Sequence, residues 1–232
     1  MKKRAPRYTH EHRCLVAIDC IIFGFDGSEI RLLLVHRGFE PEKGKWSLMG
    51  GFLQPKESLE DAANRILQQL TGLKGVYMEQ LSVFSDPDRD PVERTLSVAF
   101  YALIDIHRYE KQLSENFRPE WFSLNKVPAL VFDHNHMVEL AREKLMQKAS
   151  AEPILFELLP DRFTLPQVQA LYESLYGRKF DKRNFSRKML ASSLLIRQKE
   201  KERTQSKKGA YFHTLNRRSH DRTQRIIPPP TL

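Results

Sequence analysis

The apolar segment at residues 14–25 sets the strongest limit on what this chain can fold into. It is nearly continuous, rich in β-branched residues, and Asp19 is its only charged residue. A helix that crosses a bilayer needs about 20 apolar residues, so this segment is too short to span a membrane. Asp26 and Gly27 are typical of a tight hairpin turn and lead into a second apolar segment at residues 30–35. The chain is therefore expected to open with two paired, buried strands.

Strands and helices are mixed in the region that follows the hairpin. A helix ended by Gly72 is predicted by apolar residues at helical spacing, at positions 59, 62, 63, 66, 67 and 70. Strands are expected at residues 77–84 and 95–104, and Asp133 is the expected N-cap of a further helix. This order predicts an α/β body that ends near residue 150.

The net charge of the chain is confined to its last third. Residues 1–150 hold 21 Lys and Arg and 21 Asp and Glu, whereas residues 151–232 hold 17 and 8, which accounts for the overall charge of +9. Basic side chains gain affinity for nucleic acid by releasing condensed counterions, so a neutral body with a basic terminal module favours a polyanionic partner. A solvated basic face or tail is the alternative that charge alone leaves open.

Two short helices and a wing are expected within this basic third. Thr164 can cap the first helix, which ends at Gly177 and carries the apolar stripe Val168, Leu171, Tyr172 and Leu175. Asp181 is the expected N-cap of the second helix, whose inner face is Phe185, Met189 and Leu190. A basic loop between two later strands would form the wing. Such a pair of helices can place the second one in the major groove.

The basic and amide side chains of the second helix and the wing are the candidate DNA-binding residues. Base contacts are expected from the start of the helix, and phosphate contacts from the wing and from Lys199 and Lys201. The set is Lys182, Arg183, Asn184, Arg187, Lys188, Lys207 and Lys208. The predicted organisation is an α/β body (1–150), a connector (151–162), a winged helix-turn-helix (163–216) and a basic flexible tail (217–232).

A loop and helix at residues 46–73 carry the most specific motif of the α/β body. Residues 46–52 are Trp-Ser-Leu-Met-Gly-Gly-Phe, and together with the following helix they resemble the Nudix box, G x5 E x7 R E U x E E x G U, where U is aliphatic. The matching positions, with the spacing intact, are Gly51, Glu57, Arg65, Leu67, Gly72 and Leu73. The resemblance implies a Nudix-like α/β/α sandwich and makes residues 1–150 a Nudix-like effector-binding and dimerisation domain.

Three carboxylates of the Nudix box are missing, and Ile66, Gln69 and Leu70 stand in their places. In active relatives those glutamates hold the divalent cations that activate water and neutralise a pyrophosphate, which requires anionic oxygen ligands. No catalytic residue, cofactor or metal ligand is therefore expected. Glu57 and its acidic neighbours fit an exposed first helical turn better than a weak ion site. An active pyrophosphohydrolase acting on ADP-ribose, or on a related nucleoside diphosphate derivative, is the alternative.

Body and basic module together resemble the Nudix-related transcriptional regulators, over residues 12–215. In that family a ligand-sensing Nudix-like domain precedes a winged helix-turn-helix that binds double-stranded operator DNA. Because one recognition helix reads only a few base pairs, a homodimer on a palindromic operator is expected. With no membrane span and no signal-peptide cleavage site in the sequence, the expected location is cytoplasmic. One branch senses ADP-ribose and controls NAD metabolism; another senses a sugar such as L-arabinose and controls carbohydrate genes. Residues 19–25 and 46–52 look more similar to the arabinose-responsive branch. A repressor of sugar-utilisation genes is accordingly expected.

The effector is expected where a Nudix substrate would lie, between the loop before Gly51 and residues 88–93. Without a metal or a carboxylate cluster a diphosphate would have few partners there, so a pentose such as L-arabinose is favoured over ADP-ribose. The candidate effector-binding residues are Asp19, Trp46, Gly50, Gly51, Arg89, Asp90, Glu93 and Arg94. His134 and His136 are two residues apart and do not share a helix face, which favours a structural role over a metal site.

Overall fold

The computed structural model describes residues 11–109, 112–113, 117–203 and 209–216. The predicted tail at 217–232 and the candidate residues Lys207 and Lys208 lie outside these ranges. Within the described part of the chain, every helix is too short or too polar to cross a bilayer.

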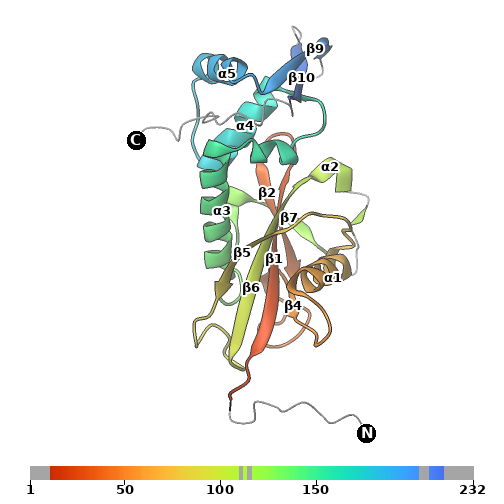
Figure 1. The fold of residues 1–232 in the computed structure, drawn as a ribbon, viewed down its shortest axis with the longest axis vertical. Helices are drawn as coiled ribbons and strands as arrows, with labels where there is room; N and C mark the ends of the chain where they lie inside the picture. Colours follow the sequence, from red (N-terminus) through yellow and green to blue (C-terminus); the bar gives the residue numbers. More distant parts are fainter. Residues whose placement is uncertain (1–10, 110–111, 114–116, 204–208, 217–232) are drawn as a thin grey trace.

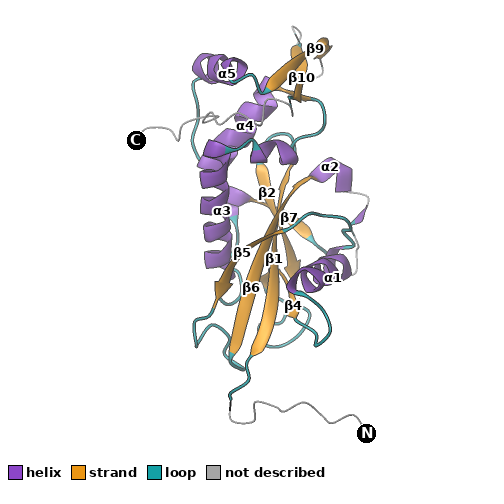
Figure 2. Ribbon diagram, in the orientation of Figure 1, coloured by secondary structure: helices purple, strands orange, loops and turns teal. Residues whose placement is uncertain are grey.

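The body is built on a seven-stranded sheet with helices on both faces (Figure 1, Figure 2). Its strand order is β3-β2-β1-β6-β5, with β4 also paired to β1 and β7 to β2. β1 and β6 run parallel along their whole length, and the other pairs are antiparallel. The strands are β1 (Leu15–Phe25), β2 (Ile30–His36), β3 (Trp46–Ser47), β4 (Met49–Phe52), β5 (Glu79–Phe84), β6 (Thr95–Asp105) and β7 (Glu120–Ser123).

Alternate residues of β1 face two different hydrophobic clusters, one on each side of the sheet. One cluster joins Ile18, Cys20 and Ile22 to the apolar stripe of α1 (Leu59–Thr71). The other joins Ile21, Phe23 and Phe25 to α3 (His134–Ala151). Two short helices, α2 (Ile106–Tyr109) and the 3-10 helix η2 (Leu124–Lys126), complete the body. The predicted α/β/α sandwich is thereby confirmed.

Local sequence signals fix the ends of α1 and the position at which α3 starts. Ser58 and Asp61 form a reciprocal capping box at the start of α1, and Gly72 ends that helix with a φ of 83°, which glycine adopts without strain. Asp133 is the N-cap residue of α3, as expected, but its side chain does not cap the helix. Both oxygens of its carboxylate accept hydrogen bonds from Arg89 instead.

The C-terminal residues form a winged helix, as expected. Its elements are η3 (Ile154–Leu158), β8 (Phe163–Thr164), α4 (Leu165–Tyr176), α5 (Lys182–Ala191), β9 (Leu195–Glu202) and β10 (Ala210–Leu215). Thr164 caps α4, Gly177 ends it, and Asp181 accepts the Asn184 N–H at the start of α5. The expectation that Leu190 belongs to the inner face of α5 is wrong, because this residue is 53% exposed.

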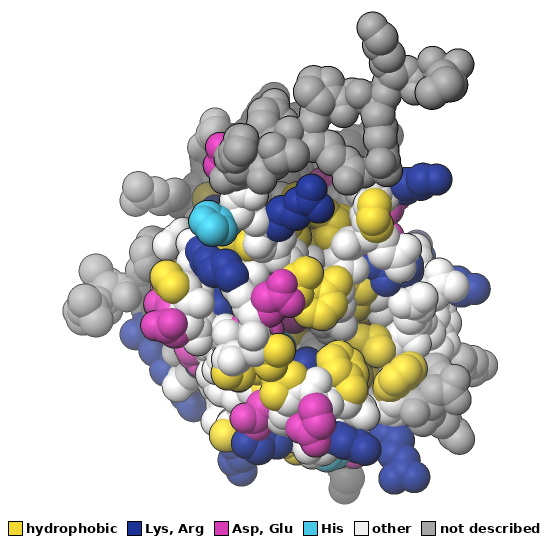
Figure 3. Space-filling view, turned by 90° about the horizontal axis from the view of Figure 1, so that it is seen from below, with side chains coloured by type: hydrophobic (Ala, Val, Ile, Leu, Met, Phe, Trp, Pro, Cys, Tyr) yellow, Lys and Arg dark blue, Asp and Glu magenta, His cyan; other side chains and the backbone are white. Residues whose placement is uncertain are grey.

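The end of the molecule opposite the winged helix is seen in Figure 3. On this face apolar side chains lie between charged ones.

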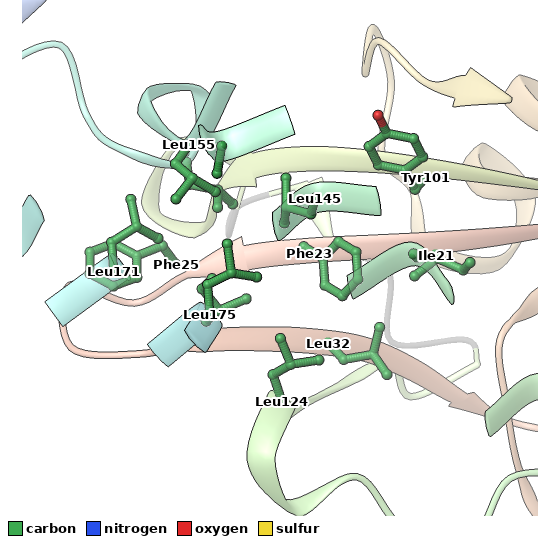
Figure 4. Close-up of a cluster of buried hydrophobic side chains, with 14 of the residues drawn as sticks. Ile21, Phe23, Phe25, Leu32, Tyr101, Leu124, Leu145, Leu155, Leu171 and Leu175 are labelled. Carbon is green, nitrogen blue, oxygen red and sulfur yellow. The ribbon is translucent and has the colours of Figure 1, made fainter. Parts of the chain in front are cut away.

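Body and winged helix share one hydrophobic core. Leu171 and Leu175 of α4 approach Phe25 at the end of the sheet (Figure 4), and the expected connector contributes the buried side chain of Leu155 to the same cluster. The Ser174 hydroxyl oxygen accepts a hydrogen bond from the Ile30 N–H at 2.8 Å. A side chain of α4 thereby satisfies the buried backbone N–H at the start of β2. Movement of α4 must therefore disturb packing within the body.

Candidate effector pocket and DNA-binding surface

A pocket open to solvent lies between β1, β4, the end of β2 and the loops that precede β6 and α3. The space of about 710 Å³ that it spans includes part of the surrounding solvent. The polar residues that line it are Asp19, Arg37, Ser47, Arg89, Asp90, His36 and His134, and the apolar ones include Phe39, Phe52, Leu70, Phe117 and Phe132.

A buried ion-pair network forms the polar floor of this pocket. Arg89 donates to both oxygens of Asp133, at 2.9 Å from Nε and 2.7 Å from Nη2, and its Nη2 lies 3.8 Å from Asp19 Oδ2. Burial lowers the pKa of Arg89, but the hydrogen bonds and charges of its acidic neighbours outweigh that effect and raise it. Ser97 donates its hydroxyl proton to Asp19. Asp19, inside the apolar strand β1, therefore has a cationic partner and a hydroxyl donor from two other segments.

His134 belongs to the same network, although sequence reasoning gave it only a structural role in the first helical turn. The Leu48 N–H donates to its Nδ1 at 3.2 Å, which leaves the ring proton on Nε2, 3.4 Å from Asp19 Oδ1. Burial lowers the pKa of His134, so the ring is neutral at pH 7. No local signal could have revealed this contact, since residues 48 and 134 are 86 positions apart.

Two glycines of β4 let this strand lie close to the Asp19 side chain of β1 and to α1. A Cβ atom on Gly50 would lie 2.5 Å from Asp19 Oδ1, and one on Gly51 would lie 3.0 Å from the Ile66 side chain. Both glycines line the cavity, together with Asp19, Arg89 and Asp90. The structure thus brings together five of the eight expected effector-binding residues.

The other three expected residues do not line this cavity. Trp46 packs between the rings of His36 and Phe122, at centroid distances of 3.7 and 4.7 Å. The Arg94 guanidinium donates to the carbonyl oxygens of Ser85 and Asp86, so it fixes the loop instead of facing the pocket. Glu93 is exposed outside the cavity.

Phenylalanines that the sequence did not single out form the apolar wall. Phe39, Phe52 and Phe117 are 57%, 47% and 39% exposed at the rim, and Phe132 has a φ of 52°, a strained value for a bulky residue. The Arg37 Cζ lies 4.1 Å from the centroid of the Phe39 ring and 5.0 Å from that of Phe132. Exposed aromatic rings beside cations form a surface suited to a flat, anionic ligand.

The helix of the Nudix-like motif presents no ligand set for a divalent cation. Leu70 faces the cavity, and Ile66 is buried beneath Gly51. Glu57 is held by a two-point contact with Arg65, which also donates to Gln69. In the residues with a described position, no three or more His, Cys, Asp or Glu side chains gather as a metal site would require. The residues present therefore do not fit the cations that an active Nudix site holds.

The expected DNA-binding side chains lie together on the outer face of α5. All five candidates on this helix are exposed, whereas Phe185 and Met189 face the core. Arg187 donates to the side-chain oxygen of Asn184, so two of the candidates orient each other. In the wing, Lys199 is exposed, and Lys201 lies 4.4 Å from the centroid of the Tyr211 ring. These positions form a basic helix and strand at the end of the molecule opposite the cavity.

Comparison with known proteins assigns both parts of the chain. Residues 15–141 match the NUDIX domain model, and residues 155–215 match the NrtR DNA-binding winged helix domain. The ADPR responsive transcriptional repressor NtrR of Acinetobacter baylyi is 29% identical over 211 residues, 89% of this chain and 84% of that protein. An ADP-ribose pyrophosphatase of Methanocaldococcus jannaschii is 34% identical over 125 residues, 53% of this chain and 70% of that protein.

Solved structures of one regulator are similar to most of this chain or to its Nudix domain. Shewanella oneidensis NrtR has a TM-score of 0.73 at 30% identity, covering 90% of this chain and 97% of that one. Its complex with a 27mer DNA has a TM-score of 0.72 at 28% identity, with coverages of 90% and 96%. Its NUDIX domain with ADP ribose has a TM-score of 0.54 at 30% identity, covering 61% of this chain and 94% of that one. The chain therefore belongs to the Nudix family and carries an NrtR-type DNA-binding winged helix domain behind its Nudix domain.

Proposed function

We propose that this protein is a transcriptional repressor that releases its operator when ADP-ribose occupies the Nudix-domain pocket. The observation that carries the proposal is the lining of the pocket, which combines two guanidinium groups with four phenylalanines. The repressor of A. baylyi is described as ADPR responsive, and the Shewanella structures include complexes with DNA and with ADP ribose. These relatives support the same pair of partners for this chain.

The pocket offers a separate kind of group for each part of ADP-ribose. Exposed phenylalanine rings at the rim suit the adenine, and the Asp19 and Asp90 carboxylates suit ribose hydroxyls. Arg37 and Arg89 supply positive charge for a diphosphate. A pentose alone would leave the aromatic rim without a role. ADP-ribose therefore replaces the expected L-arabinose as the effector, and the regulated genes need not concern sugar use.

The Nudix domain is proposed to bind this ligand without hydrolysing it. Leu70 faces the pocket where an active relative carries a metal-binding carboxylate, and neither Ile66 nor Gln69 can replace that ligand. The pyrophosphatase relative keeps hydrolysis as the second candidate function. Magnesium-dependent release of AMP from ADP-ribose, near the usual enzymatic median of about 10 per second, would favour that candidate.

Helix α3 connects the pocket with the DNA-binding domain. It begins at His134, next to the Arg89–Asp133 pair, and its later turns contact α4. There Arg142 donates two hydrogen bonds to the Leu175 carbonyl oxygen, and the Tyr176 hydroxyl donates to the Met146 carbonyl oxygen. A ligand that competes for Arg89 would shift the start of α3 and thereby α4. Such a ligand changes the DNA affinity because it binds with different affinity to the two positions of α3 and α4.

A homodimer is proposed because one recognition helix reads only a few base pairs, so two copies on a palindromic site are needed for specificity. Arg183 and Asn184 at the exposed start of α5 are the proposed base-reading residues, with phosphate contacts from Lys182, Lys188 and the wing. A change in the position of α4 would alter the spacing of the two recognition helices on the DNA.

Fluorescence anisotropy on a duplex selected from random sequences tests the proposal. We expect ADP-ribose to dissociate the complex and L-arabinose to leave it intact. Arg183→Ala is the matched control, since it should lose DNA affinity while calorimetry still detects ADP-ribose binding. Release by L-arabinose with no response to ADP-ribose would refute the proposed effector.

A further inference from the structure

Arg37 is held rigidly at the mouth of the pocket. It follows the last residue of β2, and its backbone is fixed on both sides, with its N–H donating to the Lys45 carbonyl oxygen and its own carbonyl oxygen accepting from Gly44. Its Nε donates to the Pro41 carbonyl oxygen, so the side chain is also anchored within this loop. A side chain fixed in this way loses little conformational entropy when it binds a ligand.

The two arginines of the pocket differ in how their charges are balanced. Arg89 already contacts two carboxylates, whereas Arg37 belongs to none of the ion pairs found among the described residues. Burial lowers the pKa of Arg37, and the opposing effect of nearby acids, Asp90 first, does not fully offset it. Arg37 is thus a half-buried cation that an anionic ligand would stabilise.

The orientation of Arg37 also restricts which part of a ligand it can meet. Two phenylalanine rings, Phe39 and Phe132, already pack against its planar group. Its stacking surface is therefore used within the protein, and its Nε N–H is bound to the Pro41 carbonyl oxygen, which leaves the Nη N–H groups at its edge to bind a ligand. Such an edge matches the paired oxygens of a phosphate rather than the face of a nucleobase.

We propose that Arg37 recognises the diphosphate of the effector and takes the place of the divalent cations that the altered Nudix helix no longer holds. This inference rests on the proposed function and adds a specific consequence. Binding of ADP-ribose should not require magnesium, because the protein itself supplies the positive charge. Arg37 is then a specificity residue that separates nucleoside diphosphates from neutral nucleosides and sugars.

Calorimetric titrations with matched variants test this inference. Arg37→Gln removes the charge and keeps much of the side-chain length. Arg31→Gln is the control, because Arg31 lies on β2, the strand that leads into Arg37, but pairs with Asp26 and Glu29 outside the pocket. Loss of charge-assisted hydrogen bonds should weaken ADP-ribose binding by about ten- to hundredfold in Arg37→Gln, with little change in Arg31→Gln. Adenosine should bind both variants equally, and EDTA should not weaken wild-type binding of ADP-ribose.

Two results would overturn the inference while leaving the proposed effector intact. One is an ADP-ribose affinity in Arg37→Gln within twofold of the wild type; the other is loss of wild-type binding on addition of EDTA. If the wild type fails to bind ADP-ribose, the proposed function fails, and titration with inorganic pyrophosphate decides about Arg37. Pyrophosphate binding that Arg37→Gln loses and Arg31→Gln keeps would support the inference, and absence of pyrophosphate binding to the wild type would overturn it.

Discussion

Replacing Arg89 by methionine should destabilise the folded protein substantially. Methionine keeps the length of the side chain but leaves Asp133 and the buried Asp19 without their shared cation. The Arg89 side chain is 4% exposed and makes two charge-assisted hydrogen bonds to Asp133. Removing one partner of a buried pair typically costs about 3 to 5 kcal/mol, and the lower value applies here because Asp133 is 22% exposed.

Thermal unfolding followed by differential scanning fluorimetry measures this loss. At about 2 to 4 °C per kcal/mol for a chain of this size, a loss of about 3 kcal/mol lowers Tm by about 6 to 12 °C. Arg94→Met is the control, since Arg94 is exposed and donates only to loop carbonyl oxygens; it should lower Tm far less. The double variant Arg89→Met/Asp133→Asn should lose less stability than the two single losses combined, because no unpaired charge is left at position 133. A Tm within about 2 °C of the wild type for Arg89→Met would refute this account of the pocket floor.

Three further perturbations test other parts of the account. Arg183→Ala should cost about 1 to 3 kcal/mol of binding free energy on the selected operator and much less on random DNA. Lys199→Ala should weaken binding to both DNAs equally. If anisotropy titrations show that Arg183→Ala also weakens binding to both DNAs equally, base reading by α5 is contradicted. Leu175→Ala should cost about 2 to 5 kcal/mol and leave a single calorimetric transition, because Leu175 is buried in the core shared by body and winged helix; separate melting of two domains would contradict that shared core. His134→Gln should flatten the fall in Tm between pH 7 and 5. Burial lowers the pKa of His134 in the folded state, so below the ordinary value of 6.5 the unfolded chain takes up this proton first and the stability falls with pH. Burial also lowers the pKa of His213, which accounts for a fall in Tm that remains in the variant. A fall in Tm as steep in His134→Gln as in the wild type would contradict a buried, neutral His134.

Features encoded within a few neighbouring residues were predictable from the sequence. The stop of α1 at Gly72 and the caps of α4 and α5 at Thr164 and Asp181 depend on groups three or four positions away from their partners. The nearly continuous apolar run along β1 likewise predicts a strand buried on both faces. The resemblance to the Nudix box then gave the order of the layers, which periodicity alone does not determine.

Contacts between distant segments were not predictable in the same way. Arg89 and Asp133 are 44 positions apart, and a helix pattern that begins after an aspartate favours a cap over an ion pair. The aromatic wall depends on Phe39, Phe117 and Phe132 from three separate loops, none of which carries a motif. Without that wall and Arg37, the loss of the carboxylates favours a neutral sugar, and the likeness of residues 19–25 and 46–52 to the arabinose-responsive branch then favours L-arabinose.

Linkage between the two binding sites tests the central claim most directly. If ADP-ribose releases the operator through the protein, the operator must weaken ADP-ribose binding by the same factor, typically about 5- to 150-fold. The measurement is calorimetric titration of ADP-ribose into the free protein and into the protein saturated with operator DNA, at one salt concentration. We predict a weaker affinity in the complex, by the factor by which ADP-ribose lowers operator affinity in anisotropy titrations. Equal ADP-ribose affinity with and without operator would contradict the claim that this pocket controls DNA binding.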